Sequence, residues 1–169
     1  MTQERTPDES HYLGDRIDRL YVAAARDALF DRVSGDVLNV GIGYGTWDER
    51  LAERQGAGGS TTVSLDISRH LVAEFASRYP RIDYVCTDVF DYRPRRKFGT
   101  IVASHFLEHV DDPVRLLRLF RSWLQPAGRI LVVVPNAESI HRQLGQKMGL
   151  LAALTDLNDA DRLLGHKRV

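Results

Sequence analysis

The sequence predicts an α/β fold: a Rossmann-like, doubly wound and mainly parallel sheet with helices on both faces. Strand-like and helix-like segments alternate between residues 37 and 134. Three glycines follow the first strand-like segment at alternate positions, and an acidic residue follows each of the next two. Alternating strands and helices favour a parallel sheet, because each helix carries the chain back across a face of the sheet.

The first half of the chain predicts two strands and two helices. Apolar residues at helical spacing indicate an amphipathic helix over residues 17–29. A short apolar run at 37–40 is typical of a buried strand, and a helix is expected behind it over 46–54. After a glycine-rich turn at 56–60, the β-branched residues of 61–65 predict the second strand.

The second half continues the alternation. Ser68 is expected to cap a helix over 69–78 that ends before Pro80. Asp112 and Pro113 are typical of a helix start, with an acid at the cap and proline in the first turn. The remaining expected elements are strands over 82–86, 98–103 and 129–134, and a helix over 111–124.

Composition bounds the class of protein. The 169 residues fit one domain, with residues 1–13 expected to be flexible. Lys plus Arg and Asp plus Glu both total 23, and this zero net charge argues against a nucleic-acid or membrane-surface partner. No apolar run is long enough to span a membrane. A single cysteine, Cys86, excludes an intramolecular disulfide, which favours a reducing, cytoplasmic compartment. Cys86 itself is expected to be a core residue of its strand.

The last expected strand is apolar on both faces, which suits the interior of a sheet rather than an edge. Residues 136–169 contain no further convincing strand, so we expect that strands flanking it are missing from this chain. A helix or a partner chain covering the edge is the alternative. Residues 136–169 are expected to form a helical segment on the substrate side of the site, and residues 165–168 are assigned no role.

The glycines and the acids are expected to share one crevice, because ligands of such sheets bind beyond the carboxyl ends of the strands. Glycine suits a sharp turn that a ligand approaches closely, since it carries no Cβ. Asp66, Asp88 and residues 104–109 each follow an expected strand. The sequence therefore predicts a ligand site at this edge of the sheet.

These motifs, in this order, resemble class I S-adenosylmethionine-dependent methyltransferases over residues 37–135. The resemblance implies that S-adenosyl-L-methionine is the cofactor. It implies that the glycine loop wraps the methionine part, that Asp66 binds both ribose hydroxyls, and that Asp88 meets the adenine amino group. The implied cofactor-binding residues are Gly41, Gly43, Gly45, Asp66, Ile67, Asp88, Val89 and Ser104.

One position departs from the family pattern. The family usually has an acid two places before the first glycine, where this chain has Asn39. An amide accepts hydrogen bonds but brings no negative charge to the cofactor's ammonium group. We therefore expect weaker cofactor binding, or an ammonium group held by backbone carbonyls near Gly41 and Ser104.

The segment 105–109, His-Phe-Leu-Glu-His, leaves three interpretations open. If it is helical, His105, Glu108 and His109 share a face. His105 or His109 is then a candidate catalytic base that removes a proton from the methyl acceptor. The second interpretation is a metal site, because the segment resembles the metal-binding Glu-x-x-Glu-His motif of ubiquinone-type O-methyltransferases. His105 stands where that motif has its first glutamate, so no metal ligand is assigned. The third interpretation is a structural role beneath the cofactor.

The resemblance implies methyl transfer to the oxygen or nitrogen of a small molecule of quinone, sugar or natural-product type. One alternative is an NAD(P)-dependent oxidoreductase, disfavoured because the glycines do not follow G-x-G-x-x-G and no Tyr-x-x-x-Lys pair is present. The other is a catalytically silent cofactor-binding scaffold. A homodimer is a possible assembly.

Overall fold

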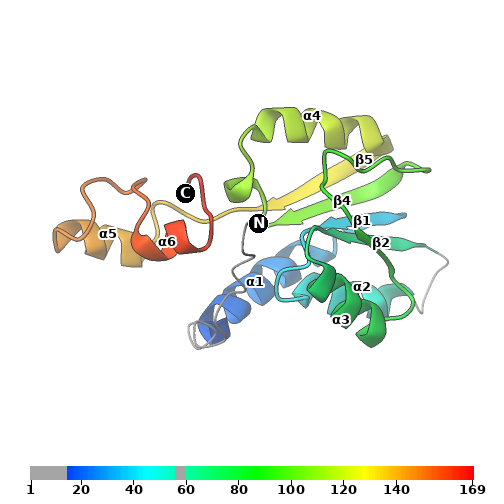
Figure 1. The fold of residues 1–169 in the computed structure, drawn as a ribbon, viewed down its shortest axis with the longest axis horizontal. Helices are drawn as coiled ribbons and strands as arrows, with labels where there is room; N and C mark the ends of the chain where they lie inside the picture. The colour runs from blue at the N-terminus through cyan, green and yellow to red at the C-terminus, as the bar shows by residue number, and fades with distance from the viewer. Residues whose placement is uncertain (1–14, 56–59) are drawn as a thin grey trace, which may run out of the picture.

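A computed structural model describes residues 15–55 and 60–169. Within them, five parallel strands form one sheet in the order β3-β2-β1-β4-β5 (Figure 1). The strands are β1 (Val37–Val40), β2 (Thr62–Asp66), β3 (Asp83–Cys86), β4 (Phe98–Ser104) and β5 (Leu124–Val133). The order reverses at β1, where the chain crosses from β3 to the far side of β1 to form β4. The expected doubly wound parallel sheet is confirmed.

Helices lie on both faces of this sheet (Figure 1). The helices are α1 (Asp15–Phe30), α2 (Thr46–Gln55), α3 (Arg69–Arg78), α4 (Pro113–Trp123), α5 (Ile140–Lys147) and α6 (Asp159–Leu163), with a 3-10 turn, η2 (Leu107–His109). Helices α1 to α3 cover one face and α4 covers the other, whereas α5 and α6 lie beyond the carboxyl ends of the strands (Figure 1). None of the helices in the described residues is both long and apolar enough to cross a membrane.

Two apolar layers follow from the alternation of side chains along the strands. On the α4 side, Leu38 and Val40 pack with Phe120 and Trp123. On the other side, Val37 packs with residues of α1 and α2, including the buried Trp47 and Leu51. Asn39 shares the face of Val37 in this alternation, which places its side chain on the α2 side.

The helix starts follow the expected chemistry. Ser68 caps α3 by accepting a hydrogen bond from the Leu71 N–H, and Asp112 caps α4 by accepting one from the Arg115 N–H. Side chains of this kind satisfy N–H groups that the first helical turn leaves without backbone partners. Pro113 stands in the first turn of α4, as the sequence predicts.

Three expectations need comment. β5 begins at Leu124 rather than 129, because Leu124 pairs with Phe98 before an irregularity in the register. β5 ends the strand order in the described residues, and residues 136–169 add no strand beside it, in keeping with the expectation that the flanking strands are missing from this chain. Cys86 is exposed rather than in the core, because β3 forms the opposite edge of the sheet. The expected flexible segment 1–13 and most of the turn at 56–60 lie outside the described residues.

Candidate cofactor-binding site

The loop after β1 needs glycine for two physical reasons. Gly41, Gly43 and Gly45 all have positive φ angles, of 84°, 52° and 70°, which side chains other than glycine rarely adopt. A Cβ on Gly45 would lie 1.8 Å from Cε1 of Phe75, and one on Gly41 would lie 2.8 Å from Cδ2 of Phe106. Gly43 has open space around it. The loop is therefore packed at its two ends and free at its middle.

Asp66 joins this loop to the end of β2. One carboxylate oxygen accepts the Ile42 N–H and the other accepts the Ser68 N–H, each at 2.8 Å. The Gly41 N–H also donates to the Leu65 carbonyl at 2.8 Å. A carboxylate has about four acceptor positions, so Asp66 retains capacity for a ligand hydroxyl.

The end of β3 supplies the next part of the site. Asp88 is exposed, and its Oδ1 accepts the Phe90 N–H at 2.8 Å. Val89 is buried, whereas Ile67 after β2 is 72% exposed. Thr87 N–H donates to the Asp66 carbonyl at 3.0 Å, which fixes the two strand ends side by side.

A cleft of about 470 Å³ opens between these strand ends and the segment after β4. Its size falls within the range usual for small-molecule and cofactor sites. It is lined by Leu65, Asp66, Ile67, Thr87, Asp88, Val89, Phe90, Phe106, His109, Val110, Asp111, Asp112, Arg115 and Lys167.

The cleft brings together five of the residues that the sequence predicts for the site: Asp66, Ile67, Asp88, Val89 and His109. The three glycines, Ser104 and His105 do not line it. Phe106 accounts for part of this difference, because its ring lies against Gly41 and also forms a wall of the cleft. The two acids and Val89 therefore share one cavity, and the glycine loop lies behind the Phe106 ring.

The helix considered over residues 105–109 is not formed. The chain makes only the 3-10 turn η2, and His105 precedes it with a φ of 50°. This left-handed conformation is uncommon for a residue other than glycine, although histidine adopts it more often than most. The His105 N–H donates to the Val133 carbonyl at 2.8 Å, which anchors the residue between β4 and β5. The Ser104 Oγ is buried and has no hydrogen-bond partner in the part of the chain that the structure describes.

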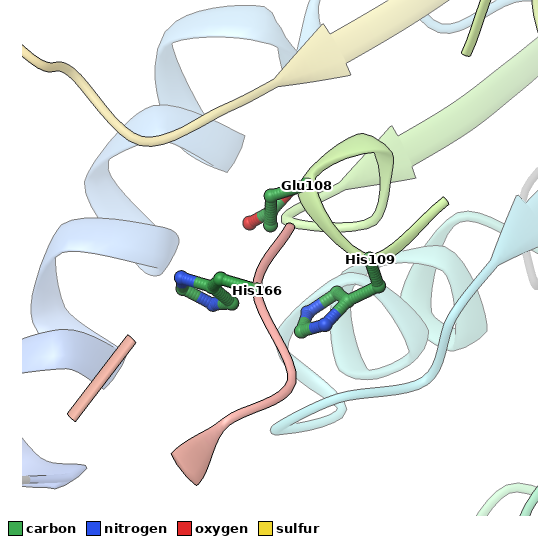
Figure 2. Close-up of side chains that lie close together, drawn as sticks. All are labelled: Glu108, His109 and His166. Atoms are coloured by element: carbon green, nitrogen blue, oxygen red, sulfur yellow. The ribbon is translucent and has the colours of Figure 1, made fainter. Parts of the chain in front are cut away.

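Glu108 is the buried acid of the site, with only 2% of its surface exposed. Within residues 15–55 and 60–169, neither carboxylate oxygen has a hydrogen-bond partner, although His105 Nδ1 lies 3.3 Å from Oε1. His109 and His166 lie beside it, and their ring centroids are 4.8 Å apart (Figure 2). The structure thus keeps His105 beside Glu108, as considered from the sequence, and adds His166 to the group, because ligand atoms of Glu108, His109 and His166 lie within 4.8 Å of one another.

Desolvation lowers the pKa of His109, and Glu108 and the Gly165 backbone oppose this only in part. The neighbouring His166 and His105 lower the pKa further. Because the ordinary pKa of histidine is about 6.5, His109 is neutral at pH 7. A neutral imidazole can accept a proton or bind a metal ion.

Residues 165–168, which we call the strap, contribute contacts beside the cleft although the sequence predicts no role for them. Lys167 N–H donates to the Glu108 carbonyl at 2.8 Å, and its ammonium group binds Asp111. Arg168 donates to the carbonyls of Leu107 and Asp111 at 3.0 and 3.1 Å. The polar Gly-His-Lys-Arg cluster was the available signal, but its partners lie more than 50 residues earlier.

Asn39, the departure from the family pattern, does not line the cleft. Its side chain is fully buried and donates to Asp48 at 3.1 Å and to Ser64 at 3.2 Å. The amide therefore binds partners within the layer between the sheet and α2. The carboxylate next to Asn39 in this layer belongs to Asp48, nine positions later in the chain.

A glycine loop at the strand-order reversal, with acids after the next two strands, defines a cofactor-binding domain of the doubly wound class. The profile of a family described as "Methyltransferase domain" matches residues 10–159. The chain therefore belongs to this family, whose members share the class I methyltransferase fold that the sequence resembles.

Curated relatives agree with this assignment. The chain is 29% identical over 106 residues to a ubiquinone biosynthesis O-methyltransferase of Coxiella burnetii (strain Dugway 5J108-111), an alignment covering 59% of this chain and 43% of the relative. It is 29% identical over 136 residues to the protein of that name from Rhodopseudomonas palustris (strain BisB5), covering 72% of this chain and 52% of the relative. The chain thus spans about half the length of these relatives.

Solved structures share the fold. The plantazolicin methyltransferase BpumL, in complex with a pentazolic desmethylPZN analog and SAH, aligns with a TM-score of 0.65 at 15% identity, covering 93% of this chain and 61% of BpumL. The DhpI–SAM–HEP complex aligns with a TM-score of 0.61 at 25% identity, covering 82% of this chain and 64% of DhpI.

Proposed function

We propose that this domain binds S-adenosyl-L-methionine in the cleft and transfers its methyl group to the oxygen or nitrogen of a small molecule. One observation carries the proposal: the Asp66 carboxylate is hydrogen-bonded to the glycine loop and lines the same cleft as Asp88. Membership of the methyltransferase-domain family supports it. The similar solved structures of BpumL, in complex with SAH, and of DhpI, in complex with SAM, also support it.

Different residues of the site are proposed to bind different parts of the cofactor. Asp66 suits the ribose hydroxyls, because its carboxylate keeps free acceptor positions. Asp88 suits the amino group of adenine, and the apolar side chains of Val89 and Ile67, which line the same cleft, suit its ring. Gly41, Gly43 and Gly45 are the positions for the methionine part, which requires the Phe106 ring to move off Gly41. The Ser104 hydroxyl is buried without a hydrogen-bond partner among the described residues, so it is available to bind the cofactor.

The cofactor supplies an electrophilic methyl group, and the protein's task is to align the acceptor and exclude water. We assign proton acceptance from a hydroxyl acceptor to His105, with His109 as the second candidate. Three features of His105 support this: its left-handed backbone, its 38% exposed side chain, and its Nδ1 only 3.3 Å from Glu108. Uncommon backbone conformations cluster at functional sites, and a neighbouring carboxylate orients an imidazole.

The acceptor proposed is a small molecule, and a hydroxylated one fits best. The relatives from Coxiella burnetii and Rhodopseudomonas palustris are both O-methyltransferases by name. The zero net charge of the chain gives no electrostatic reason for a nucleic-acid acceptor. The matched family and the relatives above lend no support to an NAD(P)-dependent oxidoreductase. A cytoplasmic location stays a prediction.

Titration calorimetry with S-adenosylhomocysteine tests cofactor binding. We expect roughly micromolar affinity for this chain, and an affinity lower by about 10- to 100-fold in Asp66→Ala, which loses charge-assisted hydrogen bonds. NAD is expected to give no signal. Asp31→Ala, at an exposed acid distant from the cleft, is the matched control. Equal affinity in the wild type and Asp66→Ala would remove Asp66 from the site.

The proposed base has its own test, with an acceptor found by screening small phenols and amines. His105→Ala should lower kcat for a phenol by about 100-fold or more and remove the acidic limb of its pH profile. Its affinity for S-adenosylhomocysteine should not change. His141→Ala, at an exposed position of α5, is the control. An unchanged pH profile in His105→Ala, with the limb lost in His109→Ala, would transfer the role to His109.

A further inference from the structure

Helix α4 carries three exposed arginines and has no acidic residue along its length. Arg115, Arg118 and Arg121 stand three positions apart, so neighbouring members of the row lie close together on the helix surface. α4 covers one face of the sheet, opposite α1 to α3 (Figure 1). Its buried residues pack on the sheet, which turns the three arginines outward.

The segment 90–97, which leads from β3 to β4, adds further cations beside α4. At one end the Arg115 guanidinium lies over the Phe90 ring, with its Cζ 4.7 Å from the ring centroid. At the other end the Lys97 ammonium group donates to the Ser122 carbonyl of α4. The two elements therefore lie side by side. Their exposed cations, which we call the basic face, are Arg93, Arg95, Arg96, Lys97, Arg115, Arg118 and Arg121.

The cations of the basic face have no acidic partners within residues 15–55 and 60–169. None of the seven takes part in a salt bridge there, whereas Arg50 of α2 pairs with Glu53. Arg115 stands in the first turn of α4, where the helix dipole disfavours a positive charge. Like charges this close on a helix also destabilise it. Interactions within the chain thus do not explain this concentration of charge, and an anionic partner outside the chain does.

We propose that the basic face docks an acidic protein, through a partner helix that carries aspartates or glutamates three and four positions apart. At a rise of 1.5 Å per residue, the row from Arg115 to Arg121 is about 9 Å long, and two turns of such a helix match it. Six of the seven cations are arginines, whose planar guanidinium binds a carboxylate through two hydrogen bonds. Val114, 55% exposed on the same helix, supplies an apolar contact.

The rest of the surface favours a protein over a nucleic acid. The chain has zero net charge, because acids elsewhere compensate for the basic face. Exposed acids of this kind on or next to α1 and α2 are Asp27, Asp31, Glu49 and Glu53. Nucleic acids attract proteins mainly through many phosphate contacts and a broad positive field. A short acidic helix needs only local charge, since charges more than about 10 Å away are largely screened at 0.1 M salt.

The basic face is also unlike a membrane-binding helix. Such helices bury a broad apolar face in the lipid. Val114 is the only large apolar side chain that α4 exposes. Arg115 lines the cofactor cleft as well, so a partner docked on α4 lies beside the cleft. The proposal itself does not depend on the proposed methyl transfer.

Fluorescence anisotropy with a labelled model peptide tests the proposal. The probe is a helical, alanine-rich peptide with glutamates alternately three and four positions apart, and its control has glutamines at these positions. We expect the glutamate peptide to bind saturably at low ionic strength, at least about tenfold more weakly at 150 mM salt, and the glutamine peptide not to bind. Arg118→Glu/Arg121→Glu should weaken binding by about tenfold or more, and Arg118→Gln/Arg121→Gln by an intermediate factor.

Arg69→Glu/Arg81→Glu is the matched control, because it changes the net charge equally at exposed positions outside the basic face. Its affinity for the peptide should stay within about twofold of the wild type. Equal weakening by the two glutamate variants would overturn the proposal. Affinity for S-adenosylhomocysteine should be the same in the wild type and in both variants. This readout verifies that the variants fold, and it separates a failure of this proposal from a failure of the cofactor site.

Other occupants are distinguished under the same conditions. The chain is titrated with an oligothymidylate of the same charge as the peptide, and with vesicles of phosphatidylserine and phosphatidylcholine. Tighter binding of either than of the peptide would overturn the proposal in favour of a nucleic acid or a membrane. Sedimentation of the chain alone at low salt tests a second copy. Self-association that is lost in Arg118→Glu/Arg121→Glu would make a second copy the occupant and would also overturn the proposal.

Discussion

At the scale of single residues, Asp48 is a carboxyl group enclosed between the sheet and α2. Its side chain is fully buried and accepts hydrogen bonds from Asn39 at 3.1 Å and from Tyr84 at 3.3 Å. Burial raises the pKa of Asp48 from 3.8 to about 6, although the hydrogen bonds from Ser64, Tyr84 and Asn39 oppose the shift. The folded protein therefore holds a proton on Asp48 that the unfolded chain releases above about pH 4.

This shift predicts a pH dependence of stability with a definite sign. Between about pH 4 and pH 6 the folded state binds more protons than the unfolded state, so the free energy of unfolding falls as pH rises. The difference between 3.8 and about 6 corresponds to about 3 kcal/mol lost by pH 7. Asp48→Asn should remove this dependence and should be more stable than the wild type at pH 7.

Urea unfolding at pH values between about 4 and 8 measures the effect. Asp31→Asn, at an exposed acid, controls for the loss of one negative charge. The prediction is wrong if the free energy of unfolding of the wild type rises steadily from pH 4 to pH 7 and has the same pH dependence as that of Asp48→Asn. That result would show that the folded state holds a charged Asp48 at little cost.

The residues of the site were predictable where local rules fix them. Asp66 and Asp88 follow parallel strands, and the carboxyl ends of such strands share one edge, so their common cleft follows from the sequence. Cys86 was misplaced because the order of strands, rather than its own strand, decides whether β3 is an edge. The backbone of His105 was beyond prediction, because its positive φ depends on the bond from its N–H to Val133 on another strand.

At the scale of elements, α5 and α6 depend on one buried side chain. Arg142 of α5 is only 5% exposed; it donates to the Leu154 carbonyl at 2.8 Å and binds Asp161 of α6 at 3.2 Å. Burial alone would raise the pKa of Asp161, but the Asn158 N–H and Arg142 lower it below its usual value. Asp161 is thus charged at pH 7, and the pair links the two helices beyond the sheet.

Arg142→Met should release this segment without unfolding the sheet. Removing one partner of a buried ion pair costs about 3–5 kcal/mol, which corresponds to amide exchange faster by roughly 100-fold or more across residues 154–168. Hydrogen exchange measured by mass spectrometry compares this segment with β1 and β4, whose rates should stay unchanged. Arg162→Met, at an exposed arginine of α6, is the control. Faster exchange throughout the sheet would mean that α5 and α6 belong to its cooperative unit.

Most element positions were predictable, because hydrophobic periodicity and capping residues are local signals. The start of β5 was not, since its first residues join the strand only by pairing with Phe98. The turn at η2 was also missed. Spacing alone places His105 and Glu108 on one face of a helix, but the chain bends at His105 before a helix can form.

At the scale of the whole molecule, the chain brings its last residues back to the segment after β4. The bond from Lys167 to Asp111 joins positions 56 residues apart, and the bond from Arg168 to Leu107 joins positions 61 residues apart. Neither contact has a periodic signal in the sequence, so the strap and its His166 could be found only from the fold. The site is therefore partly local, at the strand ends, and partly long-range.

The open edge of β5 bears on assembly. In the described residues β5 ends the strand order, and Val134, which directly follows it, is 50% exposed. Exposed strand edges present unpaired N–H and C=O groups that pair readily with another chain. A symmetric pairing of two β5 edges would extend the sheet across a two-fold axis and cover this apolar end. The possible homodimer expected from the sequence therefore has a candidate interface.

Sedimentation velocity over a range of protein concentrations tests this assembly. The wild type should shift from monomer to dimer as concentration rises, and Val134→Lys should weaken the dimer about tenfold or more, because a charged side chain at the end of an edge strand opposes its pairing with another chain. Val114→Lys, on α4 with 55% of its surface exposed, adds the same charge away from the edge and should leave the dimer intact. A wild type that stays monomeric, or equal weakening by both lysines, would show that β5 is not the interface.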